Sequence, residues 1–164
     1  MDGLRALTLM AATISMGLVA GVFGLYGHTI MPGLKKTDDR TFVVAFQSID
    51  RAIINPWFMG GGFLGALVFT AAAGIFNIGE DALPWIVGAF VLYVATFVIT
   101  VAINVPLNDA IKAAGEPDRI PDLRAVRAQF NEARWARWNL VRVLASTTAF
   151  GCLAWALVLH GGST

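Results

Sequence analysis

The residues best suited to chemistry in this sequence stand at the edges of long apolar stretches. His28 ends the first stretch, Asn104 and Asn108 flank the end of the third, and Asn139 and Arg142 open the fourth. Polar groups inside a membrane protein are costly and normally face its interior, so we expect these side chains to meet. An imidazole, amides and a guanidinium in one pocket would suit proton transfer and anion stabilisation.

The spacing around Arg142 predicts a shared helix face. Four residues recur at separations of four, three and four positions: Trp135, Asn139, Arg142 and Ser146. Such a set forms one stripe along a helix. Arg142 lies about one turn into the apolar region, where a cation needs a counter-charge or several carbonyls. Asp50 is the nearest carboxylate by topology.

Structural alternatives accompany each of these residues. Pro106 cannot donate a backbone hydrogen bond and disfavours helix before it, so the segment Asn104–Asn108 is predicted to break or kink. The two asparagine amides would then cap freed carbonyls. Arg142 can snorkel at the interface, and Asp50 can belong to a solvated pair. Their common depth nonetheless favours a polar cavity.

The composition predicts the elements that position these residues. The 164-residue chain is 57% hydrophobic and 14% charged, whereas a soluble domain carries about 25% charged residues. A membrane helix needs about 20 apolar residues. The predicted spans cover residues 4–30, 57–78, 84–105 and 140–160. The prediction is an all-α, four-transmembrane-helix bundle that forms one integral membrane domain over residues 1–164.

Two polar segments between the spans are predicted to be helical. An amphipathic helix over residues 39–54 places phenylalanines on one face and Gln47 and Asp50 on the other, and it lies at the interface or folds against the bundle. Between the third and fourth spans, a short helix ends at Gly115. A second helix follows Pro121 and runs without a break into the fourth span.

The first span is predicted to be a retained helix, since its apolar stretch exceeds that of a signal peptide. The segment Met31–Gly33 is expected to end it. Small residues and a histidine recur on one side of this helix: Gly17, Gly21, Gly24 and His28. Small residues let membrane helices approach closely, so we expect this side to pack inward and to carry His28 with it.

The charges predict an orientation and exclude some partners. Ten lysines and arginines fall in the two polar segments between the spans, and Arg5 alone lies on the other side. The positive-inside rule places these segments in the cytoplasm and both termini outside. We expect a bacterial inner (plasma) membrane. The net charge of +1 gives no reason to expect nucleic-acid binding.

Several familiar chemistries are absent from the sequence. It has no glycine-rich phosphate loop, no Cys/His metal cluster and no Ser-His-acid pattern. His28 and His160 fall at opposite ends of the predicted bundle, so one chain cannot use both on a single haem iron. Cys152 is the single cysteine and is predicted to be a buried, inert thiol.

Short motifs occur in order along most of the chain. They are Met31-Pro32-Gly33-Leu34, Asp50-Arg51-Ala52-Ile53-Ile54-Asn55-Pro56, Asn104-Val105-Pro106-Leu107-Asn108, and Trp138-Asn139 followed by Arg142. With them the sequence resembles the anthrone oxygenase-like membrane proteins, many of which are catalogued only as a domain of unknown function. The resemblance implies oxidation of anthrones to anthraquinones in aromatic polyketide pathways without a metal or flavin, so no cofactor is expected. It carries over no catalytic residues.

The implied reaction suits the predicted pocket. An anthrone is acidic at the carbon opposite its carbonyl, and its enolate reacts with oxygen directly. Our hypothesis assigns catalysis to His28, Asp50 and Arg142, with His28 or Asp50 as the base. Arg142, with Asn104 or Asn139, would hold the oxyanion. Substrate binding is assigned to Asn104, Asn108, Trp135, Trp138 and Asn139.

Three functions remain open at this stage. The protein is an oxygenase or related enzyme for a lipophilic aromatic molecule, a non-enzymatic accessory subunit, or a binding or transport protein for a lipophilic molecule such as a quinone. An enzyme or binder should have a cavity lined by His28, Asn104, Asn139 and Arg142, whereas a structural subunit should have them fully paired without a void. The expected partners are the lipid bilayer and such a molecule; a homo-oligomer or membrane complex is left open.

Overall fold

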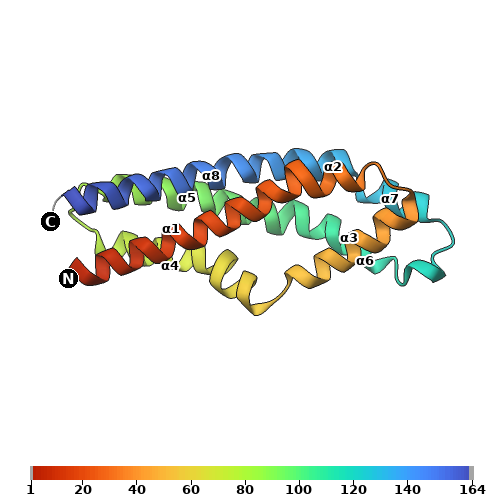
Figure 1. Cartoon of the computed structure of the whole chain (residues 1–164), viewed down its shortest axis with the longest axis horizontal. Coiled ribbons are helices and arrows are strands. Elements are labelled where there is room, and N and C mark those ends of the chain that lie inside the picture. Colours follow the sequence, from red (N-terminus) through yellow and green to blue (C-terminus); the bar gives the residue numbers. More distant parts are fainter. Residues whose placement is uncertain (1, 163–164) are drawn as a thin grey trace.

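The computed structural model describes residues 2–162, and these residues contain helices and no strand. Four helical rods are long and apolar enough to cross a membrane: Asp2–Leu34, Trp57–Phe76, Leu83–Ala113 and Leu123–Gly162. They run along one another, with both chain ends at one end of the bundle and the connecting helices α2, α3, α6 and α7 at the other (Figure 1). We call these the terminal end and the loop end. The chain is a membrane protein with the predicted four-helix bundle.

Most rods combine α-helical and π-helical segments. The first rod is α1 (Asp2–Leu25), η1 (Tyr26–Ile30) and α2 (Met31–Leu34), and α3 (Asp39–Ile53) follows it. The second is η2 (Trp57–Leu64) and α4 (Gly65–Phe76). The third is α5 (Leu83–Ile99), η3 (Thr100–Asn104) and α6 (Val105–Ala113). After the 3₁₀ turn η4 (Pro117–Arg119), the fourth is α7 (Leu123–Phe130) and α8 (Glu132–Gly162). Segments η1, η2 and η3 are π-helical.

Two prolines lie beside π-helical segments and do not end their helices. In an α-helix, the ring of a proline clashes with the carbonyl four residues earlier. For Pro32 that carbonyl belongs to His28 in η1, and for Pro106 it belongs to Ala102 in η3. The wider π turn relieves the clash, so both rods continue past their proline. The first rod ends at Leu34, one residue past the predicted stop at Met31–Gly33. At Pro106 the predicted break is wrong, because the helix continues from η3 into α6.

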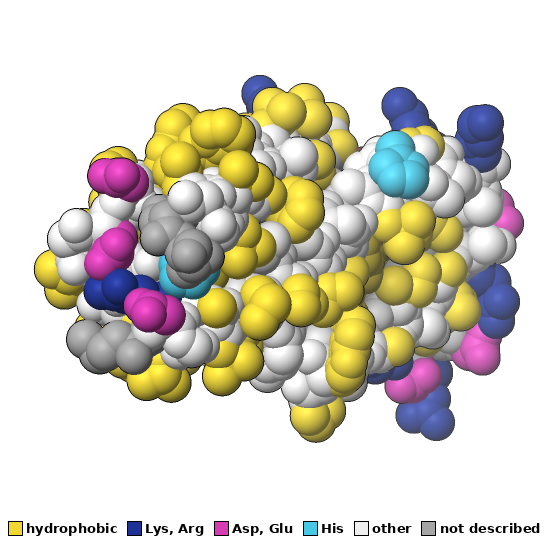
Figure 2. Space-filling view, turned by 60° about the vertical axis from the view of Figure 1, so that its left-hand side comes forward, with side chains coloured by type: hydrophobic (Ala, Val, Ile, Leu, Met, Phe, Trp, Pro, Cys, Tyr) yellow, Lys and Arg dark blue, Asp and Glu magenta, His cyan; other side chains and the backbone are white. Residues whose placement is uncertain are grey.

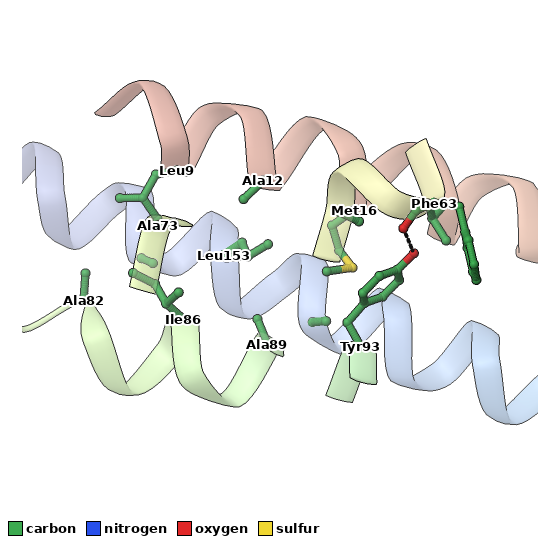
Figure 3. Packing of buried hydrophobic residues seen from close by; sticks show 14 of the residues in the cluster. Leu9, Ala12, Met16, Phe63, Ala73, Ala82, Ile86, Ala89, Tyr93 and Leu153 are labelled. Carbon is green, nitrogen blue, oxygen red and sulfur yellow. Dashed lines mark hydrogen bonds between the residues drawn. The ribbon is translucent and has the colours of Figure 1, made fainter. Parts of the chain in front are cut away.

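The bundle core is built from small and aliphatic residues. Helix α1 packs against α4 and α8, and α5 packs against α8. Leu9, Met16, Ile86 and Leu153 are fully buried where these helices meet, near Tyr93 (Figure 3). Most charged side chains in Figure 2 gather at the two ends of the view, and hydrophobic side chains cover the surface between them.

The predicted glycine face of the first span is only partly used. A Cβ atom at Gly17 would meet the Phe150 ring of α8 at 3.0 Å. At Gly21 and Gly24 a Cβ would meet nothing within 4 Å. The helices in contact with α1 therefore cover Gly17 and leave the other two glycines open.

The loop end folds back on itself instead of spreading along an interface. Asp38 caps α3 by accepting a hydrogen bond from the Thr41 backbone at 2.9 Å, which lowers the pKa of its carboxyl. Helix α3 packs against α6 and α7. Gln47, predicted on the polar face of α3, is buried and donates to the carbonyls of Ile111 and Gly115 at 2.8 and 3.1 Å.

The helix before the fourth span is interrupted, contrary to the prediction. Asn131 adopts a left-handed backbone with φ of 55° and ends α7. Asparagine tolerates this conformation better than most residues. Its side-chain oxygen then accepts from the Arg134 backbone at 3.1 Å and so caps the start of α8. The resulting corner lets α7 lie against α3 and α6.

Gly65 gives a test of the π-helical segment in the second rod. A Cβ at Gly65 would lie 2.8 Å from the carbonyl oxygen of Gly60, whereas one at Gly61 would meet nothing within 4 Å. Gly65→Ala is expected to destabilise the protein by about 1–3 kcal/mol, and Gly61→Ala is expected to change it by less than about 0.5 kcal/mol. Thermal unfolding in detergent measures both. Equal unfolding temperatures for the two variants would contradict this packing.

Candidate functional site

A cavity of about 330 Å³ lies between the bundle core and the loop end. Each of the three π-helical segments contributes to its wall: η1 through Tyr26, η2 through Phe58 and Phe63, and η3 through Thr100 and Val101. Local π-helical geometry is often found at functional sites, because it re-aims side chains within a helix. The cavity falls within the size range of small-molecule pockets.

Arg142 forms the cationic part of the cavity wall. Its side chain comes from α8, is 4% exposed and lines the cavity. It donates to the Asn139 side-chain oxygen at 2.7 Å and to the Thr100 hydroxyl at 3.3 Å. Within residues 2–162 no carboxylate pairs with this guanidinium, and its Nε has no hydrogen-bond partner. A buried cation without a counter-charge is costly, so this arrangement favours an anion in the cavity.

Asp50 does not supply the counter-charge for Arg142. The carboxylate lines the cavity and is 6% exposed. Its Oδ2 lies 2.7 Å from the Lys112 ammonium, and its Oδ1 accepts from the Asn108 amide at 2.6 Å. Lys112 also pairs with Asp109 at 3.0 Å. The cavity therefore has a neutralised carboxylate in one place and an unneutralised guanidinium in another.

Trp135 connects the two charged groups. Its indole N–H donates to the Asn108 side-chain oxygen at 2.8 Å, and Asn108 in turn donates to Asp50. The Arg142 guanidinium lies 5.5 Å from the centre of the Trp135 ring and 4.2 Å from that of Phe23. Both contacts are within the range of cation–π attraction.

Aromatic rings make up much of the remaining wall. They come from the first three rods and from α8: Phe23, Tyr26, Phe58, Phe63, Phe97 and Trp135. Aliphatic residues and Met59 fill the rest. A flat apolar molecule can stack against such a wall, while the few polar groups fix its orientation.

Asn104 and Asn139 are buried and lie behind the cavity wall. The Asn139 amide donates to the Phe23 carbonyl at 3.0 Å, and its oxygen holds Arg142. The Asn104 amide donates to the Trp135 carbonyl at 3.4 Å. The predicted local capping by Asn104 and Asn108 is thus wrong, because both amides bond to other elements. Asn139 positions the cavity residues and does not line the cavity itself.

His28 and Trp138 do not join the cluster. His28 is exposed, and its Nδ1 lies 2.6 Å from the Thr29 hydroxyl. Its predicted inward orientation is wrong, because the buried face of this rod runs through Val19, Phe23 and Tyr26. The side that carries Gly21, Gly24 and His28 is left uncovered. Trp138 is half-buried and is not among the cavity-lining residues. Asp50, Asn108, Trp135 and Arg142, by contrast, meet at the cavity.

Sequence reasoning missed several residues of the cavity. Tyr26 is buried and lines the cavity, and no residue in 2–162 forms a hydrogen bond with its hydroxyl. In the sequence Lys112 is one of several basic residues in a polar segment, and Thr100 lies within an apolar stretch. The spacing of Lys112 three residues after Asp109, on the helix that carries Asn108, is the signal that would have pointed to it.

The described part of the chain holds no group of three or more His, Cys, Asp or Glu side chains placed to bind a metal ion. The polar groups of the cavity wall are one amide, two hydroxyls, an indole N–H, a guanidinium and an ammonium group with two carboxylates: Asn108, Tyr26, Thr100, Trp135, Arg142, and Lys112 with Asp50 and Asp109. These groups can bind an anion and accept a proton.

Comparison with known proteins bears on the family of the chain. The family model described as anthrone oxygenase matches residues 54–152, which is more than half of the 164 residues. The matched region includes Asn108, Trp135 and Arg142 of the cavity, and Asp50 lies just before it. Comparisons with curated proteins and with solved structures gave no match. The chain belongs to the anthrone oxygenase family.

Proposed function

We propose that this protein oxidises a lipophilic aromatic ketone of the anthrone type with molecular oxygen, without a cofactor, in the cavity beside Arg142. The observation that carries the proposal is the Arg142 guanidinium, which is buried, lines an aromatic cavity and has no carboxylate partner within residues 2–162. An enolate that develops in the reaction is the kind of charge this guanidinium would stabilise.

The placement of the polar groups fits the shape of such a substrate. In an anthrone the carbonyl and the acidic CH₂ group lie on opposite sides of the central ring. Arg142 and Asp50 are likewise separated, since no direct contact joins them. The Trp135 ring lies 5.5 Å from the Arg142 guanidinium, and its indole N–H donates to Asn108, which in turn donates to Asp50. A ring stacked near Trp135 would direct its carbonyl oxygen to Arg142 and its CH₂ group to Asp50.

The reaction begins with removal of a proton from the CH₂ group. Asp50 accepts this proton, and the electron pair moves into the ring system to give an enolate whose oxygen faces Arg142. His28 is not used in this scheme because it is exposed and outside the cavity. Asn139 and Thr100 hold the guanidinium so that little reorganisation is needed as the charge develops.

The enolate then supplies the electrons that reduce oxygen. One electron passes to O₂, the two radicals combine at the deprotonated carbon, and a proton gives a hydroperoxide. Loss of the second hydrogen of that carbon breaks the O–O bond, which leaves a new carbonyl and releases water. The balance is one substrate and one O₂ to one quinone and one water. The aromatic wall excludes bulk water from this sequence.

We also propose that the loop end faces the cytoplasm in a bacterial inner membrane. The ten basic residues between the spans support this orientation. This orientation in the cell membrane does not affect the reaction proposed for the cavity.

Replacement of Arg142 tests the anion-binding role. Arg142→Gln is expected to lower kcat for oxidation of an anthrone by about 10²–10³-fold, as found when an oxyanion donor is removed. The control is Arg137→Gln, because Arg137 lies on the same helix and is exposed. Oxygen consumption and quinone absorbance measure the rate. Turnover of Arg142→Gln at the wild-type rate would refute this role.

Replacement of Asp50 tests the base. Asp50→Asn keeps a side chain of the same shape but is expected to lower kcat by about 10²–10⁴-fold. Two controls are expected to keep the wild-type rate: His28→Ala, at an exposed histidine, and Glu116→Gln, at an exposed carboxylate of the loop end. A loss of activity in His28→Ala with none in Asp50→Asn would return the base role to His28.

A further inference from the structure

We infer that the cavity opens sideways into the bilayer, between η2 of the second rod and η3 of the third, and that its aromatic ligand enters there from the membrane. The inference rests on the proposed function only in assigning such a ligand to this cavity. It does not depend on the oxygenation step.

The first observation is the exposed part of the cavity wall. Leu64, Val101 and Val105 all line the cavity, and they are 44%, 52% and 39% exposed. Leu64 belongs to η2, Val101 to η3, and Val105 begins α6. These side chains therefore have one side toward the cavity and another toward the surroundings, which places them at a mouth.

The second observation is the chemistry of this mouth. The three residues lie inside helical rods that are long and apolar enough to cross a membrane. The apolar stretches over residues 57–78 and 84–105 contain all three, so we place their exposed surfaces against acyl chains and not water. Two charged residues of the cavity wall are also partly exposed. They are Asp109 and Lys112, and they lie further along α6 toward the loop end. A mouth that served a water-borne ligand would carry a polar rim.

The third observation is the backbone that creates the mouth. The second and third rods pack together through α4 and α5 near their hairpin. Segment η2 packs against α1 and the α4 helix that follows it. Near its end it still meets α5 through Phe63, whose carbonyl accepts from Tyr93 and whose ring lies 5.1 Å from that of Phe97. In Figure 1 the yellow η2 turns away from the green rod of α5 and α6. The two rods thus diverge from Phe63 toward the start of η2, opposite η3, and the cavity lies there.

The ligand class follows from the apolar mouth and walls of the cavity and from the guanidinium at its polar end. The mouth and the aromatic walls select a flat apolar body, and the unpaired guanidinium of Arg142 selects an acidic or enolisable oxygen on it. Such a molecule concentrates in the bilayer because its transfer from water is favourable. Diffusion in the membrane would deliver it directly to the mouth. An acyl chain of a lipid is the competing occupant.

Binding kinetics in vesicles test the route of access. The probe is 1,8-dihydroxyanthraquinone dissolved in the vesicle lipid, and its binding is followed by quenching of tryptophan fluorescence. The association rate is expected to follow the amount of probe per lipid and to stay constant when the vesicles are diluted in buffer. A rate that falls with aqueous dilution, or a lipid chain that no probe displaces, would overturn the inference.

A block at the mouth gives a matched pair of variants. Val101→Phe is expected to slow association about tenfold or more, because the larger side chain narrows the mouth on the path of entry. Val91→Phe is the control, since Val91 is 61% exposed on the same rod and does not line the cavity. Equal association rates for the two variants would contradict a mouth at Val101.

A second measurement needs no ligand. A spin label on Val101→Cys, in a Cys152→Ala background, is expected to collide often with oxygen and rarely with an aqueous nickel chelate. A label on Val91→Cys is the reference for lipid exposure. Frequent collision with the nickel chelate at Val101 would show a water-facing mouth and end the inference. If the probe enters from lipid but no anthrone is oxidised, the oxygenase proposal fails and the membrane route stands.

Discussion

The need to satisfy backbone carbonyls inside a bilayer shapes this molecule. Pro32 and Pro106 force wider turns in their rods, and η2 is widened around a glycine-rich stretch. Widened turns leave carbonyls to be paired by side chains, because no water is present in hydrocarbon. Asn139 donates to the Phe23 carbonyl beside η1, Ser15 to that of Gly61 at 2.8 Å, and Tyr93 to that of Phe63 at 2.7 Å (Figure 3).

These carbonyl bonds also join separate rods, and that is how the cavity keeps its shape. Asn139 uses its amide for the first rod and its oxygen for Arg142, so one side chain fixes both the helix and the guanidinium. Gly27 permits this approach, since a Cβ there would lie 3.2 Å from the Asn139 amide nitrogen. Asn139 therefore links the widened turn of the first rod to the polar cluster.

The four rods and part of the polar cluster could be predicted from the sequence. Hydrophobic length predicted four spans, and the stripe of Trp135, Asn139 and Arg142 on α8 was confirmed as an inward face. The outward position of His28 could not be predicted, because the spacing of Gly21 and Gly24 indicates a side on which helices can pack but does not show whether a neighbouring helix covers it. The partner of Asp50 was also missed, since topology indicated proximity to Arg142 but could not weigh it against Lys112.

The pairing pattern separates a structural role for the cluster from a ligand-binding role. Asn139 and Asn108 bond to other side chains or carbonyls, as they would in an internal scaffold. A scaffold alone, however, would gain from burying a neutral residue in place of Arg142, because a desolvated cation without a carboxylate is destabilising. The guanidinium is held by Asn139 and Thr100, faces an aromatic cavity and keeps its Nε unpaired within residues 2–162. A ligand with a negative charge would offset that cost, and this favours a binding site over an accessory scaffold.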